Sequence, residues 1–290
     1  MNPMASAALS LMMLGCASAQ QGAPAGVTEP PASPPARTDA LAATPDGGAV
    51  PKPFESTDAL LDALERSTQG LRDFTATVIY DRTDAITGDR ERRTGRLVLE
   101  QPVGDATRRR FGIAFDQYID ASGHASPQVQ RFAFGDGWLS EFDDARRQCI
   151  ERQLVPDGKR LDPLRLGEGP MPLPVGQSAA EVRRRFTVSP TPAPDAPLLK
   201  RLEGVQGLVL VPRPGTGLDE DFTEVRVWYD LRTLAPLGVV ATLKSGDVKT
   251  VLLRDVRVNA GLDDPARRML DRTPPAGWQR DVRPMRGGTP

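Results

Sequence analysis

Apolar and polar residues alternate along most of the chain with the period of two that is typical of β-strands. In residues 224–229, for example, Val225, Val227 and Tyr229 are expected on the face opposite the polar Glu224 and Arg226. A period of two puts one set of side chains on each face of a sheet, so we expect antiparallel strands with one face in water. The stretches predicted as strands are 75–80, 95–100, 111–115, 131–134, 138–142, 208–211, 224–229, 237–243 and 249–257.

Helical signals are confined to short segments. Residues 56–58 (STD) supply N-caps for a helix whose apolar stripe is Leu60, Leu61 and Leu64, and Gly70 ends this helix. The sequence therefore predicts few helical residues to cover the apolar face of a sheet.

The middle of the chain differs from the strand-rich parts. A short helix is predicted at 161–166, and 167–176 (GEGPMPLPVG) cannot be regular because its prolines lack a donor. Residues 178–181 (SAAE) form a capping box that opens a short helix ending near Arg185. A last helical turn begins at 264–265 (DP).

The order of these elements indicates the fold class. Residues 135–137 (GDG) form a tight-turn signal between two apolar stretches and predict a hairpin. Strands do not alternate with helices as they do in a parallel sheet. We therefore expect an α+β domain with a large antiparallel sheet.

The N-terminus resembles a secretion signal. Residues 5–14 are apolar, and 17–19 (ASA) form a small-x-small site that favours cleavage before Gln20. A Pro/Ala-rich stretch with almost no large apolar residues follows and predicts a disordered linker. The expected divisions are a signal peptide at 1–19, a linker at 20–53, a folded domain at 54–280 and a loose tail at 281–290.

The two cysteines bear on anchoring and on disulfides. Residues 13–16 (MLGC) resemble the end of a bacterial lipobox, so lipid anchoring through Cys16 is the alternative to soluble export. Under both interpretations Cys16 is unavailable for a disulfide, which leaves Cys149 alone. We expect Cys149 to act as a small hydrophobic side chain in or beside a strand.

Charge and candidate catalytic residues exclude several classes of function. The formal net charge of −1 gives no overall attraction to nucleic acid. His124 is the single histidine and lies in a turn-like stretch, so no catalytic triad and no zinc site is expected. Acidic runs at 219–221 and 263–264 suit helix capping or solvation, and arginine runs at 108–110 and 183–185 suit solvation. The sequence predicts a protein that is not an enzyme and has no cofactor or metal.

A sheet with one apolar face must cover that face. The few short helices leave two interpretations open, namely a cavity for a small apolar ligand or a plain core completed by the helices.

From Leu60 to Gly277 the chain resembles the outer-membrane lipoprotein carrier family, whose members are LolA-like. No single motif is specific, but their order matches the family. The matching stretches are 60–64 (LLDAL) with 71–76 (LRDFTA), 95–102 (GRLVLEQP) with 110–111 (RF), 135–143 (GDGWLSEFD), and 208–212 (LVLVP) with 225–230 (VRVWYD), 255–263 (DVRVNAGLD) and 275–277 (PAG).

The resemblance implies a large antiparallel sheet curled into an unclosed half-barrel, with a lid of short helices over a hydrophobic cavity. It also implies a lid-controlling arginine at Arg110, although the long stretch before it offers Arg108 and Arg109 as rivals. The residues expected to line the cavity are Leu97, Leu99, Phe111, Ile113, Leu208, Leu210, Val225, Val227 and Tyr229.

Two functions follow from the resemblance. The first is a periplasmic, monomeric carrier that sheathes the acyl chains of a lipoprotein or lipid and meets membrane-anchored donor and acceptor proteins. The alternative is an envelope-stress sensor that binds lipoprotein and a regulatory partner. Neither function involves nucleic acid.

Overall fold

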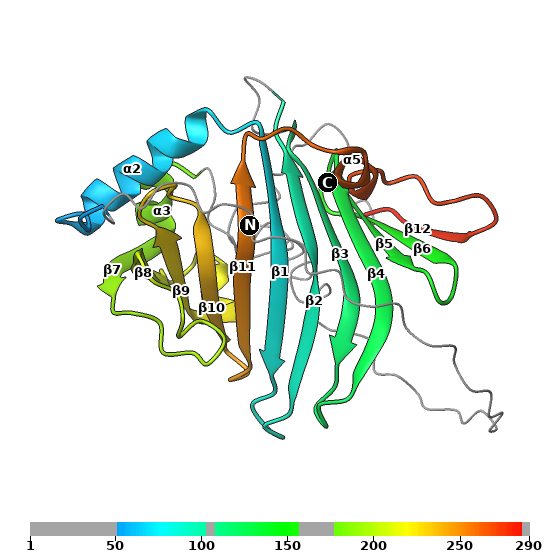
Figure 1. Ribbon diagram of the computed structural model, residues 1–290, viewed down its shortest axis with the longest axis horizontal. Helices are drawn as coiled ribbons and strands as arrows, with labels where there is room; N and C mark the ends of the chain where they lie inside the picture. The colour runs from blue at the N-terminus through cyan, green and yellow to red at the C-terminus, as the bar shows by residue number, and fades with distance from the viewer. Residues whose placement is uncertain (1–50, 103–107, 157–176, 286–290) are drawn as a thin grey trace, which may run out of the picture.

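The computed structural model describes residues 51–102, 108–156 and 177–285, and twelve strands of this part form one sheet (Figure 1). The strand order is β12-β6-β5-β4-β3-β2-β1-β11-β10-β9-β8-β7, so β12 and β7 are edges and the sheet is not closed. The strands are β1 Asp73–Thr83, β2 Arg90–Glu100, β3 Arg110–Ile119, β4 Ala125–Gly135, β5 Trp138–Asp143, β6 Gln148–Gln153, β7 Phe186–Thr191, β8 Val205–Pro212, β9 Phe222–Asp230, β10 Pro236–Leu243, β11 Val248–Val258 and β12 Gln279–Arg283.

Neighbouring strands pair antiparallel throughout, except that β12 runs parallel to β6. The pairing of β1 with β11 joins the two halves of the chain in the middle of the sheet. The predicted fold class is confirmed: a large, open, curled sheet with a few short helices. The hairpin predicted at 135–137 joins β4 and β5.

The helices are α2 Thr57–Gln69, α3 Ala179–Arg185, α4 Leu218–Asp221 and α5 Asp264–Met269. Ser56 caps α2 by accepting from the Ala59 amide at 3.1 Å, and Ser178 caps α3 by accepting from the Glu181 amide at 3.1 Å. Both caps agree with the sequence prediction. The helix predicted at 161–166 and the irregular stretch at 167–176 lie outside the described residues.

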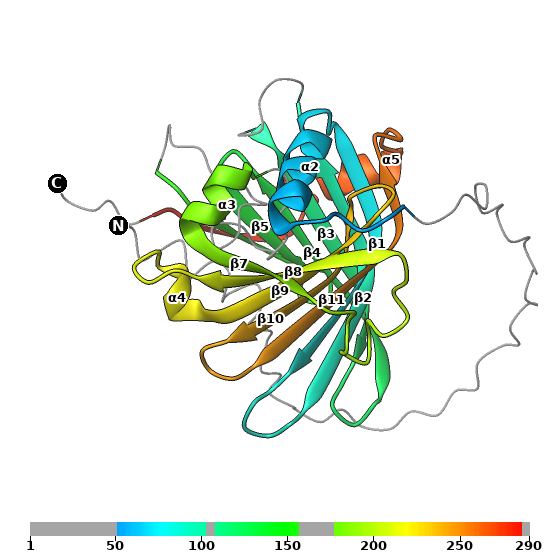
Figure 2. The ribbon, with the colours of Figure 1, turned by 90° about the vertical axis from the view of Figure 1, so that its left-hand side faces the viewer.

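Bulges let the sheet curl. The register of β2 against β3 shifts between Thr94 and Gly95, and that of β3 against β4 shifts between Phe115 and Gln117. A Cβ at Gly95 would lie 1.9 Å from the Ala114 carbonyl oxygen, so the close approach of these strands requires glycine. Each bulge increases the local bend and twist, and together they give the sheet a concave face and a convex face (Figure 2).

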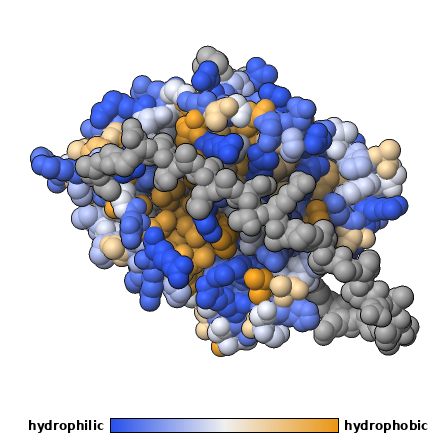
Figure 3. Space-filling model, in the orientation of Figure 1, coloured by the Kyte–Doolittle hydropathy of each residue, from blue (hydrophilic) through white to orange (hydrophobic). Residues whose placement is uncertain are grey.

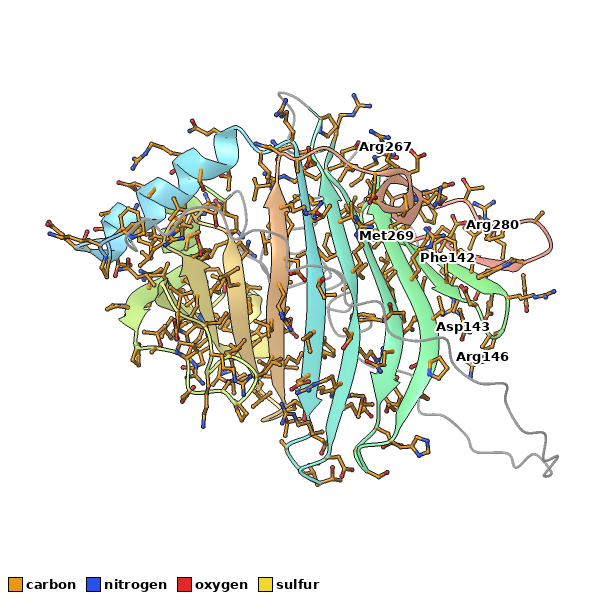
Figure 4. The ribbon with its side chains drawn as sticks, in the orientation of Figure 1. Phe142, Asp143, Arg146, Arg267, Met269 and Arg280 are labelled. Carbon is orange, nitrogen blue, oxygen red and sulfur yellow. The ribbon has the colours of Figure 1, made fainter. Side chains whose placement is uncertain are left out.

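Small clusters cover the convex face, which is the face seen in Figures 1 and 3. Met269 of α5 packs on Val98, whereas Arg267 of the same helix points outward (Figure 4). Gly112 admits this helix, because a Cβ there would lie 2.6 Å from the Met269 carbonyl oxygen. A hydrophobic area remains visible over β10 and β11 (Figure 3), where a groove is lined in part by Leu198 and Leu252.

The stretch expected as a loose tail, 281–290, begins inside β12, which spans Gln279–Arg283. Two hydrogen bonds from the Arg280 guanidinium to the buried Glu151 carboxylate, at 2.5 and 3.0 Å, hold β12 against β6. A short, charged strand of this kind has no apolar alternation by which the sequence could reveal it. No helix in the described residues is long and apolar enough to cross a membrane.

Candidate ligand-binding face

All nine residues predicted to line a cavity lie on the concave face. Each is at most 3% exposed, and all belong to one continuous apolar cluster. The strand register explains this arrangement: Leu99 lies opposite Phe111, which lies opposite Phe134, and Leu97 lies opposite Ile113. Cross-strand rows of this kind place large side chains side by side on one face.

The same cluster continues through the other half of the sheet. Val227 of β9 lies opposite Leu208 of β8 and Val239 of β10, and all three are buried. The cluster therefore runs without interruption from β5 across β1 to β8 and on to Phe186 of β7.

Two helices border the concave face at the β7 end, where they pack on each other and on β7 (Figure 2). Leu60 and Leu61 of α2 and Val182 of α3 join the apolar cluster. Polar contacts between the helices are few: Arg183 pairs with Asp58 at 2.7 Å, and the Ala179 amide donates to the Glu65 carboxylate at 2.9 Å. The ion pair is solvent-exposed, and such pairs contribute about 0–1 kcal/mol.

A row of polar groups crosses the concave face on β2, β4 and β5, and the sequence analysis missed it. The Arg93 guanidinium donates to the Gln130 side-chain oxygen at 2.8 Å, and the Gln130 amide donates to the Glu141 carboxylate at 3.3 Å. Burial raises the pKa of Glu141. The sequence feature that could have revealed this row is the polar character of Gln130 and Glu141, which occupy positions where the alternation of neighbouring strands predicts apolar residues.

A second polar group on this face lies where β1 ends and β11 begins. Tyr80, Arg82 and Lys249 share the face with the apolar cluster, and Arg82 lies directly opposite Lys249. Lys249 is 5% exposed, and burial lowers its pKa to about 8. The alternation predicted a strand at 249–257 but gave no sign that its first residue would be a buried cation.

The arginine expected to control a lid, Arg110, lies on the convex face and not beside the helices of the concave face. Its Nε donates to the Glu100 carboxylate at 2.8 Å, and both side chains are open to solvent. Arg109, one of the two rivals, precedes Phe111 by two positions and is 2% exposed, with its Nε donating to the Gln101 side-chain oxygen at 2.7 Å. The lid role therefore passes, as a proposal, to Arg109.

Replacing each arginine in turn by leucine tests whether Arg109 or Arg110 controls the lid. A guanidinium has several donors and can hold more than one backbone carbonyl. We expect Arg109→Leu to speed amide hydrogen exchange across residues 154–186, and Arg110→Leu to leave it unchanged. Hydrogen–deuterium exchange with mass spectrometry measures both. Exchange at the wild-type rate in both variants would show that neither arginine controls this segment, and faster exchange in Arg110→Leu alone would contradict the assignment to Arg109.

The other residues considered as candidates for catalysis or metal binding have structural roles or are exposed to solvent. Cys149 is buried in β6 against Phe142, and burial raises the pKa of its thiol to about 11, so it stays protonated. His124 is exposed in the turn between β3 and β4. Asp263 caps α5 by accepting from the Ala266 amide at 2.8 Å, as the capping interpretation predicted. Within the described residues no group of acidic, histidine or cysteine side chains could hold a metal ion.

No protein-family model and no curated protein matches the chain. Solved structures do resemble it. One is a putative outer membrane lipoprotein-sorting protein domain from Vibrio parahaemolyticus, with a TM-score of 0.36 and 14% identity over 72% of this chain and 94% of that chain. Another is a LolA superfamily protein from Nitrosomonas europaea, with a TM-score of 0.31 and 11% identity over 70% of this chain and 94% of that chain.

A third likeness is to the MucA/MucB complex of Pseudomonas aeruginosa, with a TM-score of 0.37 and 14% identity over 72% of this chain and 59% of that chain. LolA-superfamily and lipoprotein-sorting proteins are thus among the solved structures that this chain resembles, in agreement with the resemblance in its sequence. TM-scores below 0.5 leave the function to be argued from this chain's own residues.

Proposed function

We propose that the protein is an exported binding protein that holds the acyl chains of a lipid or lipoprotein on its concave face and carries them to an acceptor. One observation carries the proposal: the apolar cluster spans β1 to β5 and β7 to β11, whereas α2 and α3, the helices that the described residues place on this face, make their main sheet contacts with β7. A sheet face of this extent can take apolar ligands in place of a full helical layer.

The free energy gained by burying methylene groups favours acyl chains as the ligand. Burying one methylene group contributes about 0.8 kcal/mol, so ten methylenes contribute about 8 kcal/mol before the cost of ordering the chain. The ion pair between Arg183 and Asp58 is exposed and contributes about 0–1 kcal/mol to holding α3 on α2. The helices are held mainly by the buried side chains of Leu60, Leu61 and Val182, at about 1.5–3 kcal/mol each, and the methylenes of an acyl chain can replace these apolar contacts.

Transfer of a lipidated peptide tests the proposal. The full chain, freed of lipid, is mixed with vesicles that contain a fluorescent triacylated peptide and is then separated from them. We expect soluble protein to carry the peptide and to release it to a second population of vesicles. Absence of binding would refute the proposal. Binding without release would identify a receptor or sensor instead of a carrier.

Processing of the N-terminus is a second prediction of an exported protein. The apolar stretch at 5–14 followed by 17–19 (ASA) predicts cleavage before Gln20. Intact-mass measurement of protein from its native host should find a chain that begins at Gln20, or one that begins at a lipidated Cys16. A mature chain that keeps Met1 would contradict export.

A further inference from the structure

Three hydrogen-bond donors without acceptors meet on the concave face. The Tyr80 hydroxyl and the Arg82 Nε are buried and have no partner. Lys249 is 5% exposed as a residue, and within the described residues its ammonium makes no ion pair at 4 Å or less. Unsatisfied buried donors are rare because each costs about 1–3 kcal/mol, and more when charged.

The register brings the three donors together. Arg82 and Lys249 are directly opposite each other on β1 and β11, and Tyr80 is the next residue on the same face of β1. The Tyr80 ring packs against Phe115, with centroids 6.4 Å apart, so its hydroxyl is held in place. This donor cluster, formed by Tyr80, Arg82 and Lys249, therefore lies on two central strands of the sheet, where β1 ends and β11 begins.

Apolar side chains surround the donor cluster on the side of the proposed acyl site. Val251 lies opposite Tyr80, and Ala241 lies opposite Lys249 with Val225 beyond it, and all three belong to the apolar cluster. A ligand chain lying on the concave face could thus place its polar end at the donor cluster.

The carboxylates around the donor cluster pair with Arg82 and not with Lys249. Asp247 bonds the Arg82 Nη2 at 2.9 Å, Asp84 lies 3.9 Å from the same atom, and Glu91 lies opposite Arg82 on β2. Asp247 and Asp221 act on the Lys249 ammonium only through space, and the Arg82 charge opposes it. The available partner for the cluster is therefore an anionic group with several acceptor oxygens.

We propose that the donor cluster binds the anionic head, a carboxylate or a phosphate, of an acyl lipid whose chain lies on the concave face. The inference rests on the proposed function and names its ligand class, because a neutral head would leave Lys249 uncompensated. Carboxylate and phosphate present the same chemistry here, and a fatty acid and a phospholipid are the two sources.

The test compares ligands that share a chain and differ in the head. The full chain is freed of lipid and loaded with the neutral fluorescent probe N-phenyl-1-naphthylamine, which laurate, lauryl phosphate or lauryl alcohol then displaces. We expect at least one of the two anions to bind about ten-fold more tightly than the alcohol, as a charged hydrogen bond provides. The stronger of the two anions identifies a fatty acid or a phosphate-bearing lipid as the source.

Substitutions in the donor cluster test whether Lys249 and Tyr80 cause the preference for an anionic head. Lys249→Met should abolish the preference for anions and retain alcohol binding, and Tyr80→Phe should reduce anion binding several-fold. Lys244→Met is the matched control, because Lys244 is exposed on the neighbouring β10–β11 turn and its loss changes the net charge equally. Equal binding of all three heads, or a preference that survives Lys249→Met, would overturn the inference and leave acyl binding intact. Failure of the probe and of every ligand to bind would overturn the proposed function itself.

Discussion

Val227→Asp should destabilise the protein by about 4 kcal/mol or more and abolish acyl binding. Val227 is 0% exposed at the centre of β9, with buried neighbours on both adjacent strands. The substitution removes about 1.5–3 kcal/mol of apolar burial and adds the cost of desolvating a carboxylate without a partner. Because domains are stable by about 5–15 kcal/mol, much of that stability would be lost. Urea denaturation followed by circular dichroism measures the change.

Val211→Asp provides the matched control for this prediction. Val211 lies on β8, the next strand, and is 41% exposed, so the same substitution should change the free energy of unfolding by less than about 1 kcal/mol. Arg226→Asp, the alternative suggested by strand alternation, is a poorer control, because Arg226 is ion-paired with Asp195 and Glu224 at 3.2 Å each. Similar destabilisation by Val211→Asp and Val227→Asp would contradict the assignment of the two faces.

A milder variant separates ligand binding from folding. Val227→Ala should cost about 2 kcal/mol, which leaves a folded protein in which acyl affinity can be measured. A folded Val227→Ala protein that binds the fluorescent probe as tightly as the wild type would place the ligand elsewhere.

The sequence predicted the concave face well because alternation is a direct record of which side chains avoid water. Val225 and Val227 alternate with the polar Glu224 and Arg226, and a one-residue error in register would have exposed both, together with Tyr229. The same argument located Leu97 and Leu99. The curl of the sheet came from the family resemblance, since bulges such as that at Gly95 depend on the partner strand and leave no local pattern.

Charged strand ends could not be predicted in the same way. β1 continues to Thr83 and β2 begins at Arg90, well beyond the apolar stretches, because Asp81 is buried and accepts from both Arg90 and Arg92. These partners lie nine and eleven residues from Asp81, and only the hairpin brings them together. Side-chain pairing across strands, and not hydrophobicity, determines where these two strands end.

The lid arginine shows a different limit of sequence reasoning. The motif of an arginine followed by phenylalanine pointed to Arg110, but period two puts Arg110 on the face opposite Phe111. Alternation alone would have favoured Arg109, because a period of two assigns it to the face of Phe111. The physical rule and the family motif conflicted at this position, and the structure places Arg110 on the convex face, as the rule requires; the role of Arg109 stays a proposal.

Lys249→Met should stabilise the protein at pH 7, by about 3 kcal/mol. Burial lowers the pKa of Lys249 from the ordinary 10.5 to about 8, and each unit of pKa corresponds to about 1.4 kcal/mol. The charged groups that act on the ammonium are Arg82, Asp247 and Asp221. Methionine has a similar length and no charge, so it fills the site without a desolvation cost. Chemical denaturation of the two proteins at pH 7 gives the difference.

The sign of the pH dependence tests the cause of that stabilisation. Between pH 8 and 10.5 the unfolded chain holds a proton on Lys249 that the folded chain has lost, so the stability of the wild type rises with pH in this window. The advantage of Lys249→Met should therefore be full below pH 8 and vanish near pH 10.5, whereas Lys244→Met should give no advantage at any pH. A constant advantage across this range would mean that packing, and not the buried charge, is responsible. A lysine that costs stability in the unliganded protein is what a binding site requires, because an anionic ligand recovers that free energy when it binds.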